Sequence, residues 1–216
     1  MSNKVNTPVA KLLSYLFHPL LMPTYLLGVL FYFIPHGTGL DFLPPGSRGI
    51  LLLVICIYTF IIPVLGVYGM VQLKFVEDIT LRKLEDRRYP FWLTVVVYMA
   101  ATYFFGWKFG QVAEIAPVLR VVLGSITVSI VLVGVISFFW QISAHMTGIG
   151  GVTGFLMAGL LKLGDASLLS PFLLALIISG WVASSRLQLN AHSMNEVLAG
   201  FLLGFMVCGA GALLFL

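Results

Sequence analysis

The sequence has very little charge and almost no cysteine. Only 9% of its 216 residues are charged, whereas 60% are apolar, and the mean hydropathy is +1.05. Soluble domains carry roughly a quarter charged residues, so this composition excludes a water-soluble globular protein. The two cysteines, Cys56 and Cys208, lie inside apolar runs, where a free cysteine behaves as a small hydrophobic residue. The net charge of +4 is too small to indicate a nucleic-acid partner.

Long apolar runs are what the sequence does contain. A transmembrane helix needs about 20 mostly apolar residues, whereas strands of a membrane barrel alternate polar and apolar side chains. The run from Ile50 to Ile55 is apolar throughout. We therefore expect an all-α, polytopic membrane helix bundle with six to seven transmembrane helices, forming a single domain over residues 1–216. The expected spans are 14–35, 49–72, 90–107, 117–140, 144–163, 168–185 and 194–216.

Two spans have unusual composition. The first contains His18-Pro19 and Pro23, which predict a kinked or partly re-entrant segment. The fifth is rich in glycine, which is typical of close helix packing in membranes. We interpret His18 and His36 as interfacial histidines without partners.

The few charged and ionisable residues are unevenly distributed. Nine of the twenty charged residues lie between Lys74 and Arg88. The other polar outliers are His145 after the fourth span, Arg186 at the end of the sixth, and His192 with Glu196 at the start of the seventh. With seven spans, these three stretches emerge on the same membrane face. We therefore expect them to converge at one end of the bundle.

The residue types in this set suit phosphoryl transfer. His192 and Glu196 are four residues apart on a helix, so the carboxylate can fix the imidazole tautomer and leave one nitrogen as a nucleophile. The planar guanidinium of Arg186 suits a pair of phosphate oxygens, and His145 can protonate a leaving oxygen. Ser143 and the backbone amides that begin the next helix can bind phosphate oxygens.

The order and spacing of these residues resemble a known family. Residues 185–196 read Ser-Arg, five residues, His, three residues, Glu, which is similar to the SRxxxxxHxxxD signature of the type 2 phosphatidic acid phosphatase (PAP2) superfamily. Residues 142–145, Ile-Ser-Ala-His, resemble its PSGH signature, and residues 82–90 resemble its KxxxxxxRP signature more loosely. The resemblance covers roughly residues 74–205.

The resemblance, to the membrane lipid phosphatase branch of that superfamily, implies a role for each matching residue. It implies that His192 is the nucleophile, that Glu196 orients it, that His145 is the acid for the leaving group and that Arg186 binds phosphate. It also implies that neither a metal nor another cofactor is required.

The sequence departs from the family pattern in two signatures. Glu196 stands at the aspartate position, which lengthens the side chain but preserves the acceptor. Ile142 and Ala144 replace the proline and glycine of PSGH, and alanine still offers a backbone amide beside Ser143.

The first signature is the most altered. When it is aligned on Pro90, Arg82 takes the lysine position and Tyr89 takes the arginine position. The phosphate-binding cation of this segment is then Arg87 or Arg88, together with Lys83. We favour Arg87, because Lys83 and Arg87 are four residues apart.

From the sequence we expect an integral, multi-pass enzyme of a bacterial-type inner (plasma) membrane. It would hydrolyse a phosphomonoester or pyrophosphate of a lipid through a phosphohistidine. A polyprenyl pyrophosphate, phosphatidylglycerol phosphate and phosphatidic acid are candidate substrates, and membrane lipids and this lipid phosphate are the expected partners. Two non-enzymatic alternatives stay open: a bundle that binds haem or a metal through His145 and His192, and a transporter.

Overall fold

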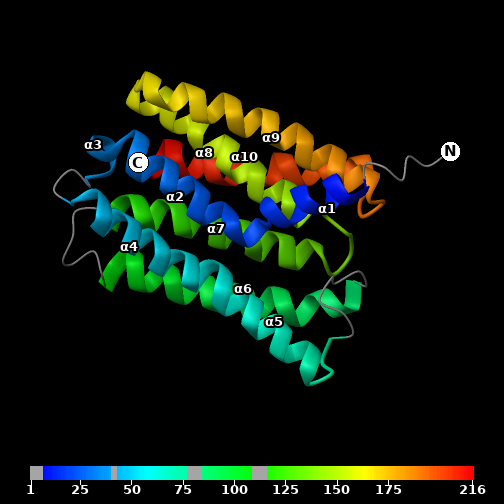
Figure 1. Cartoon of the computed structure of the whole chain (residues 1–216). Coiled ribbons are helices and arrows are strands. Elements are labelled where there is room, and N and C mark those ends of the chain that lie inside the picture. Colours follow the sequence, from blue (N-terminus) through cyan, green and yellow to red (C-terminus); the bar gives the residue numbers. More distant parts are fainter. Residues whose placement is uncertain (1–6, 40–42, 77–83, 109–115) are drawn as a thin grey trace.

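The protein is an all-α bundle with seven helical segments that are long and apolar enough to cross a membrane, counted over the residues that the structure describes. The computed structural model describes residues 7–39, 43–76, 84–108 and 116–216, and these ranges contain no strand. The spans are Thr7–Phe33, Pro45–Gln72, Arg88–Lys108, Pro117–Ile136, Ala144–Leu163, Ala166–Gln188 and Met194–Phe215. The expected fold class is confirmed (Figure 1).

These spans are built from the following elements. In chain order they are α1 (Thr7–Leu16), η2 (Pro19–Leu21), α2 (Met22–Phe33), α3 (Pro35–Thr38), α4 (Pro45–Cys56), η3 (Ile57–Ile61), α5 (Ile62–Gln72), α6 (Leu84–Tyr103), η4 (Phe104–Lys108), α7 (Ala116–Ile136), α8 (Ala144–Leu163), η6 (Ala166–Leu168), α9 (Leu169–Gln188) and α10 (Met194–Phe215).

The outer surface of the bundle is apolar. Large side chains such as Leu53, Leu65, Leu174 and Ile177 are each more than half exposed. Contiguous apolar surface of this extent is unfavourable in water, whereas lipid tails solvate it. The chain is therefore a multi-pass integral membrane protein.

The first span is broken at His18. Helix α1 ends at Leu16, His18 has an extended backbone with φ −63° and ψ 136°, and the 3₁₀ turn η2 begins at Pro19. Proline lacks an N–H group and disfavours a helical conformation at the residue before it. The chain then re-enters a helix at Met22, so the ring of His18 projects from an irregular point between α1 and α2.

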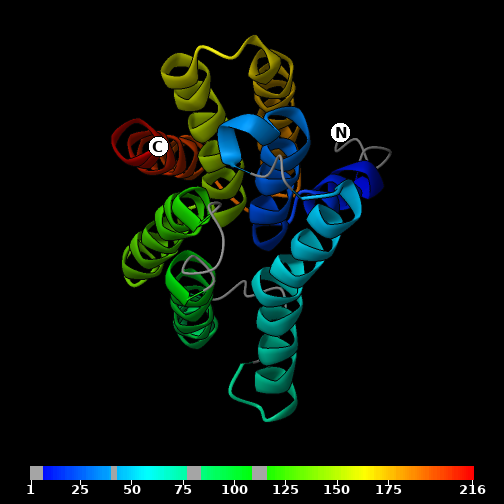
Figure 2. The ribbon, with the colours of Figure 1, turned by 90° about the vertical axis from the view of Figure 1, so that its left-hand side faces the viewer.

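The second span contains a π-helical turn with a clear cause. Pro63 has no N–H group to donate to the carbonyl of Thr59, four residues earlier. The hydroxyl of buried Tyr98, on α6, donates to that carbonyl oxygen at 3.0 Å instead. The π turn η3 lies at this point and joins α4 to α5 as one rod at the edge of the bundle (Figure 2).

Helices α8 and α10 pack with their backbones in contact. A Cβ atom added at Gly150 or Gly154 of α8 would collide with backbone atoms of Phe201 or Phe205. A Cβ atom added at Gly204 would collide with the carbonyl oxygen of Thr147. Small residues permit such close approach between membrane helices, and this contact fixes the start of α10 against the start of α8.

Candidate functional site

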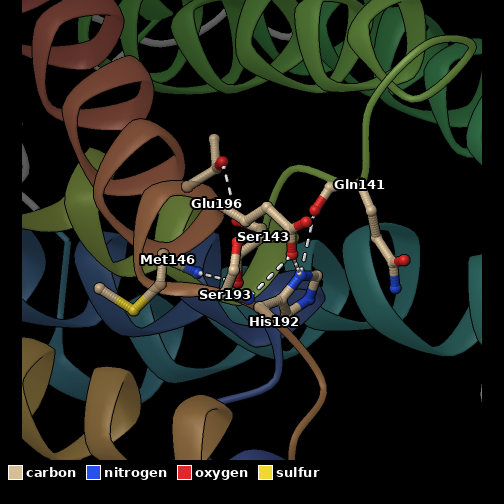
Figure 3. A network of polar contacts seen from close by, with 7 residues as sticks. Gln141, Ser143, Met146, His192, Ser193 and Glu196 are labelled. Atoms are coloured by element: carbon tan, nitrogen blue, oxygen red, sulfur yellow. Dashed lines mark hydrogen bonds and ion pairs between the residues drawn. The ribbon is translucent and has the colours of Figure 1, made fainter.

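The imidazole of His192 is held by two acceptors that share one ring nitrogen. Its Nδ1 atom lies 3.1 Å from the carbonyl oxygen of Gln141 and 3.1 Å from Oε2 of Glu196 (Figure 3). Because both partners can only accept, Nδ1 carries the proton and the neutral ring keeps its lone pair at Nε2. The side chain is only 3% exposed, so this orientation is well defined.

Glu196 has a second, structural contact. Its Oε2 atom accepts the N–H of Ser193 at 3.1 Å, and Ser193 in turn caps the first turn of α10. This reciprocal pair is a capping box, which Ser followed three residues later by Glu commonly forms at a helix start. The same carboxylate therefore caps the start of α10 and orients the imidazole that precedes this helix.

Ser143 joins the start of α8 to the start of α10. Its hydroxyl caps α8 by accepting the N–H of Met146 at 3.5 Å, and its own N–H donates to the carbonyl oxygen of Glu196 at 3.3 Å. A Cβ atom at Gly200 would lie 2.6 Å from the carbonyl oxygen of Ser143. Because the hydroxyl of Ser143 accepts from Met146, the amides of Ala144 and His145 are left in the first turn of α8 without an acceptor inside the helix.

A second polar network links His145 and Arg186 through α1. The Nε2 atom of His145 lies 3.1 Å from the carbonyl oxygen of Ser14, and Nη1 of Arg186 donates to the hydroxyl of Ser14 at 3.2 Å. Ser185 donates to the carbonyl oxygen of Ala10 at 2.5 Å, so the hydroxyl of Ser14 is the donor in its 3.0 Å contact with Ser185. Helix α1 thus contacts both His145 and Arg186.

These contacts bring His145, Arg186 and His192 to one end of the bundle. Ser14 is a shared partner of His145 and Arg186, and the start of α8, which carries His145, is hydrogen-bonded through Ser143 to Glu196, the partner of His192. The segment that precedes α8 supplies the carbonyl oxygen of Gln141 to His192. Neither Ser14 nor Gln141 is predicted from the sequence: Gln141 contacts His192 through its backbone oxygen, and Ser14 is a common residue type 131 residues away from His145.

The expectation that His18 and His36 lack partners is wrong. The rings of His18 and His145 pack edge to face with centroids 5.7 Å apart. At the other end of the bundle, His36 acts on Asp165, whose pKa is lowered mainly by its hydrogen bond to Ser167. The sequence signal for His18 is the His-Pro pair inside an apolar span, where a break in the helix frees the side chain to turn inward.

The basic segment is only partly described. Lys83 and the side chain of Arg87 lie outside the described residues, so their assignment stays a prediction. Arg88 is exposed, and its guanidinium lies over the ring of Phe138 at 5.1 Å from the centroid. Phe138 belongs to the segment between α7 and α8 that also carries Gln141, which puts Arg88 at the same end of the bundle as the histidines.

Within the described ranges, no group of three or more His, Cys, Asp or Glu side chains is arranged to hold a metal ion. One nitrogen of His192 and one of His145 already contact protein oxygens. Among the side chains that the structure describes, the cluster holds the cation of Arg186, neutral imidazoles and the carboxylate of Glu196.

The chain matches no protein-family model, no curated protein and no solved structure.

Proposed function

We propose that this protein is a membrane lipid phosphatase that hydrolyses a phosphomonoester or pyrophosphate of a lipid through a phosphohistidine. One observation carries the proposal: Nδ1 of His192 is bonded to Glu196 and Gln141, so the lone pair resides on Nε2, in a cluster that also contains Arg186 and His145. An oriented imidazole backed by a carboxylate, beside a guanidinium, is the set of groups that phosphoryl transfer to nitrogen needs.

In the first step, Nε2 of His192 attacks phosphorus and the bond from phosphorus to the leaving oxygen breaks. The ring of His192 becomes positively charged, and the carboxylate of Glu196 at 3.1 Å balances that charge. The guanidinium of Arg186 neutralises the phosphoryl oxygens, whose charge spreads over three equatorial positions in the transition state.

His145 delivers a proton to the leaving oxygen in the same step. Since its Nε2 atom is held by the carbonyl oxygen of Ser14, the proton that it transfers is carried by Nδ1 of the imidazolium form. Water then attacks phosphorus and gives a proton back to His145. The N–P bond breaks, inorganic phosphate leaves, and the lone pair of His192 is restored.

The apolar exterior supports a lipid substrate. The cluster lies at one end of helices whose outward side chains are apolar, so a lipid tail can stay in the bilayer while its phosphate reaches Arg186. A polyprenyl pyrophosphate, phosphatidylglycerol phosphate and phosphatidic acid all have this form. A bacterial-type inner membrane is the location that we propose.

The test is release of inorganic phosphate from a panel of these lipid phosphates, with a chelator present, by the purified protein. We expect His192→Ala to abolish release, because the nucleophile is removed. The variant should still fold, because Ser193 keeps its contact with Glu196. The matched control is His36→Ala at the far end of the bundle, which should retain full activity.

Unchanged phosphate release by the folded His192→Ala variant would eliminate the proposed nucleophile. Brief reaction with a ³²P-labelled substrate should label the native protein with a phosphoramidate, which is stable to alkali and lost in acid. A preparation that contains stoichiometric haem, or that moves a solute across vesicles without releasing phosphate from any substrate, would favour one of the non-enzymatic alternatives.

A further inference from the structure

His18 has its two ring nitrogens in different environments. The Nδ1 atom accepts the N–H of Leu20 at 3.3 Å and so caps the 3₁₀ turn η2. A nitrogen that accepts has no proton, so the neutral ring of His18 carries its proton on Nε2. The backbone thus fixes the tautomer of this histidine.

The position of the ring is also fixed. It packs edge to face against His145 at 5.7 Å and against Phe60 at 5.8 Å between centroids. The turn that carries it is pressed onto α8, because a Cβ atom at Gly148 would lie 2.9 Å from Met22 and 3.2 Å from Pro19. This leaves little room for the ring to move away from His145.

The Nε2–H group of His18 makes no hydrogen bond within the described part of the chain. His18 is only partly buried, so an anion can reach this group. His145, whose ring packs against His18, shares its partner Ser14 with Arg186. The donor of His18 therefore lies beside the imidazole of His145 and in the same cluster as the guanidinium of Arg186, a cation that attracts an anion.

We propose that His18 is a further phosphate-binding residue, whose Nε2–H donates to an oxygen of the phosphoryl group that Arg186 neutralises. This inference rests on the proposed function and extends the site to the first span, outside the three motifs. It gives His18 the role of a neutral, fixed donor. A neutral donor binds an oxygen without adding another positive charge to a site that already holds Arg186.

Two substitutions distinguish the proposed role of His18 as a hydrogen-bond donor to phosphate from its structural role as the cap of η2. The oxygen of Asn can replace Nδ1 as the cap of η2, so His18→Asn keeps the cap and loses the donor. The amide nitrogen of Gln reaches the position of Nε2, so His18→Gln keeps a donor and loses the cap. His36→Asn, at the opposite end of the bundle, is the matched control, and Arg186→Gln removes the cation of the site.

The experiment measures binding of orthovanadate to each full-length protein in lipid nanodiscs by calorimetry, with Tm recorded in parallel. Vanadate adopts the trigonal-bipyramidal geometry of phosphoryl transfer and is expected to bind tightly. We expect His18→Asn to weaken binding about tenfold or more with Tm unchanged, as for loss of a hydrogen bond to a charged group. His18→Gln should lower Tm by a few degrees and keep affinity within about threefold.

The outcomes are distinct. Native affinity in His18→Asn, with binding lost in Arg186→Gln, would overturn the assignment of His18 and leave the phosphatase proposal in place. Loss of affinity that follows loss of Tm in both His18 variants would overturn it too, because the residue would then act through structure alone. A native protein that neither binds vanadate nor releases phosphate from any lipid would remove both proposals together.

Discussion

Two substitutions of Glu196 distinguish its contribution to stability from its proposed contribution to catalysis. Its Oε2 atom accepts from the N–H of Ser193 and from Nδ1 of His192, each at 3.1 Å. Glu196→Gln keeps an oxygen at this point but removes the negative charge, and glutamine also forms capping boxes. Glu196→Ala removes both the acceptor and the charge.

The structure gives the expected size of each effect. Loss of the capping contact in Glu196→Ala costs about 1 kcal/mol, and Nδ1 of His192 keeps the carbonyl oxygen of Gln141, so no buried donor is orphaned. That cost lowers Tm by about 2–4 °C in a chain of this size. Glu196→Gln should melt within about 1 °C of the native protein, since both of its contacts persist.

The expected loss of activity in Glu196→Gln has a different cause from the loss of stability in Glu196→Ala. In the serine protease triad, replacing the carboxylate with an amide costs about 10⁴-fold because the wrong tautomer forms. Here Gln141 holds the tautomer independently, so Glu196→Gln should lose only the charge stabilisation of the imidazolium, about 10²-fold in kcat. Phosphate release and thermal melting of the three proteins test this. A native rate in Glu196→Gln, or a rate that falls in step with Tm across both variants, would refute the reasoning.

Other substitutions test the helix packing that positions the site and the contacts of Arg186. Gly204→Ala should destabilise the fold by about 2–3 kcal/mol or more, because its Cβ meets backbone atoms of α8, whereas Gly180→Ala on α9 meets nothing within 4 Å and should leave Tm unchanged or raised. Ser14→Ala should lower kcat/KM about tenfold through loss of the Arg186 contact, with little change in Tm. Arg186→Lys should lower phosphate affinity, because a single ammonium cannot reproduce the planar fork; native vanadate affinity in this variant would argue against phosphate binding there.

The bundle itself could be predicted because length and hydropathy decide it. Each expected span has a counterpart in the structure, and the largest differences are at Thr7, Pro45 and Ile136. The first two spans begin earlier, and the fourth ends earlier, than the apolar runs indicate. The π turn before Pro63 was not predicted. It depends on Tyr98, a residue of the next span, which supplies the donor that the proline lacks.

The pairing of His192 with Glu196 was predicted from an interval of four residues, and the structure has it. The prediction that both residues lie on one helix is wrong, because α10 begins at Met194 and His192 reaches Glu196 from the segment before it. The contact of His145 with Ser14 spans 131 residues and uses a carbonyl oxygen, which every residue has. No residue type marks such an acceptor, so Gln141 carries no sequence signal of its role, and serine is too common a residue for the hydroxyl of Ser14 to be singled out.

The positions of the two proposed catalytic histidines depend on backbone contacts more than on side-chain contacts. His145 lies in the first turn of α8 and His192 directly before α10, and these helix starts are joined where Ser143 donates to the carbonyl oxygen of Glu196. Gly200 permits that approach, since any Cβ there would push the two starts apart. A shift of about 1 Å between reacting groups can cost 10²-fold in rate. Small residues along α8 and α10 therefore position the two histidines of the proposed site as well as pack the helices, and we expect their substitution to lower activity together with stability.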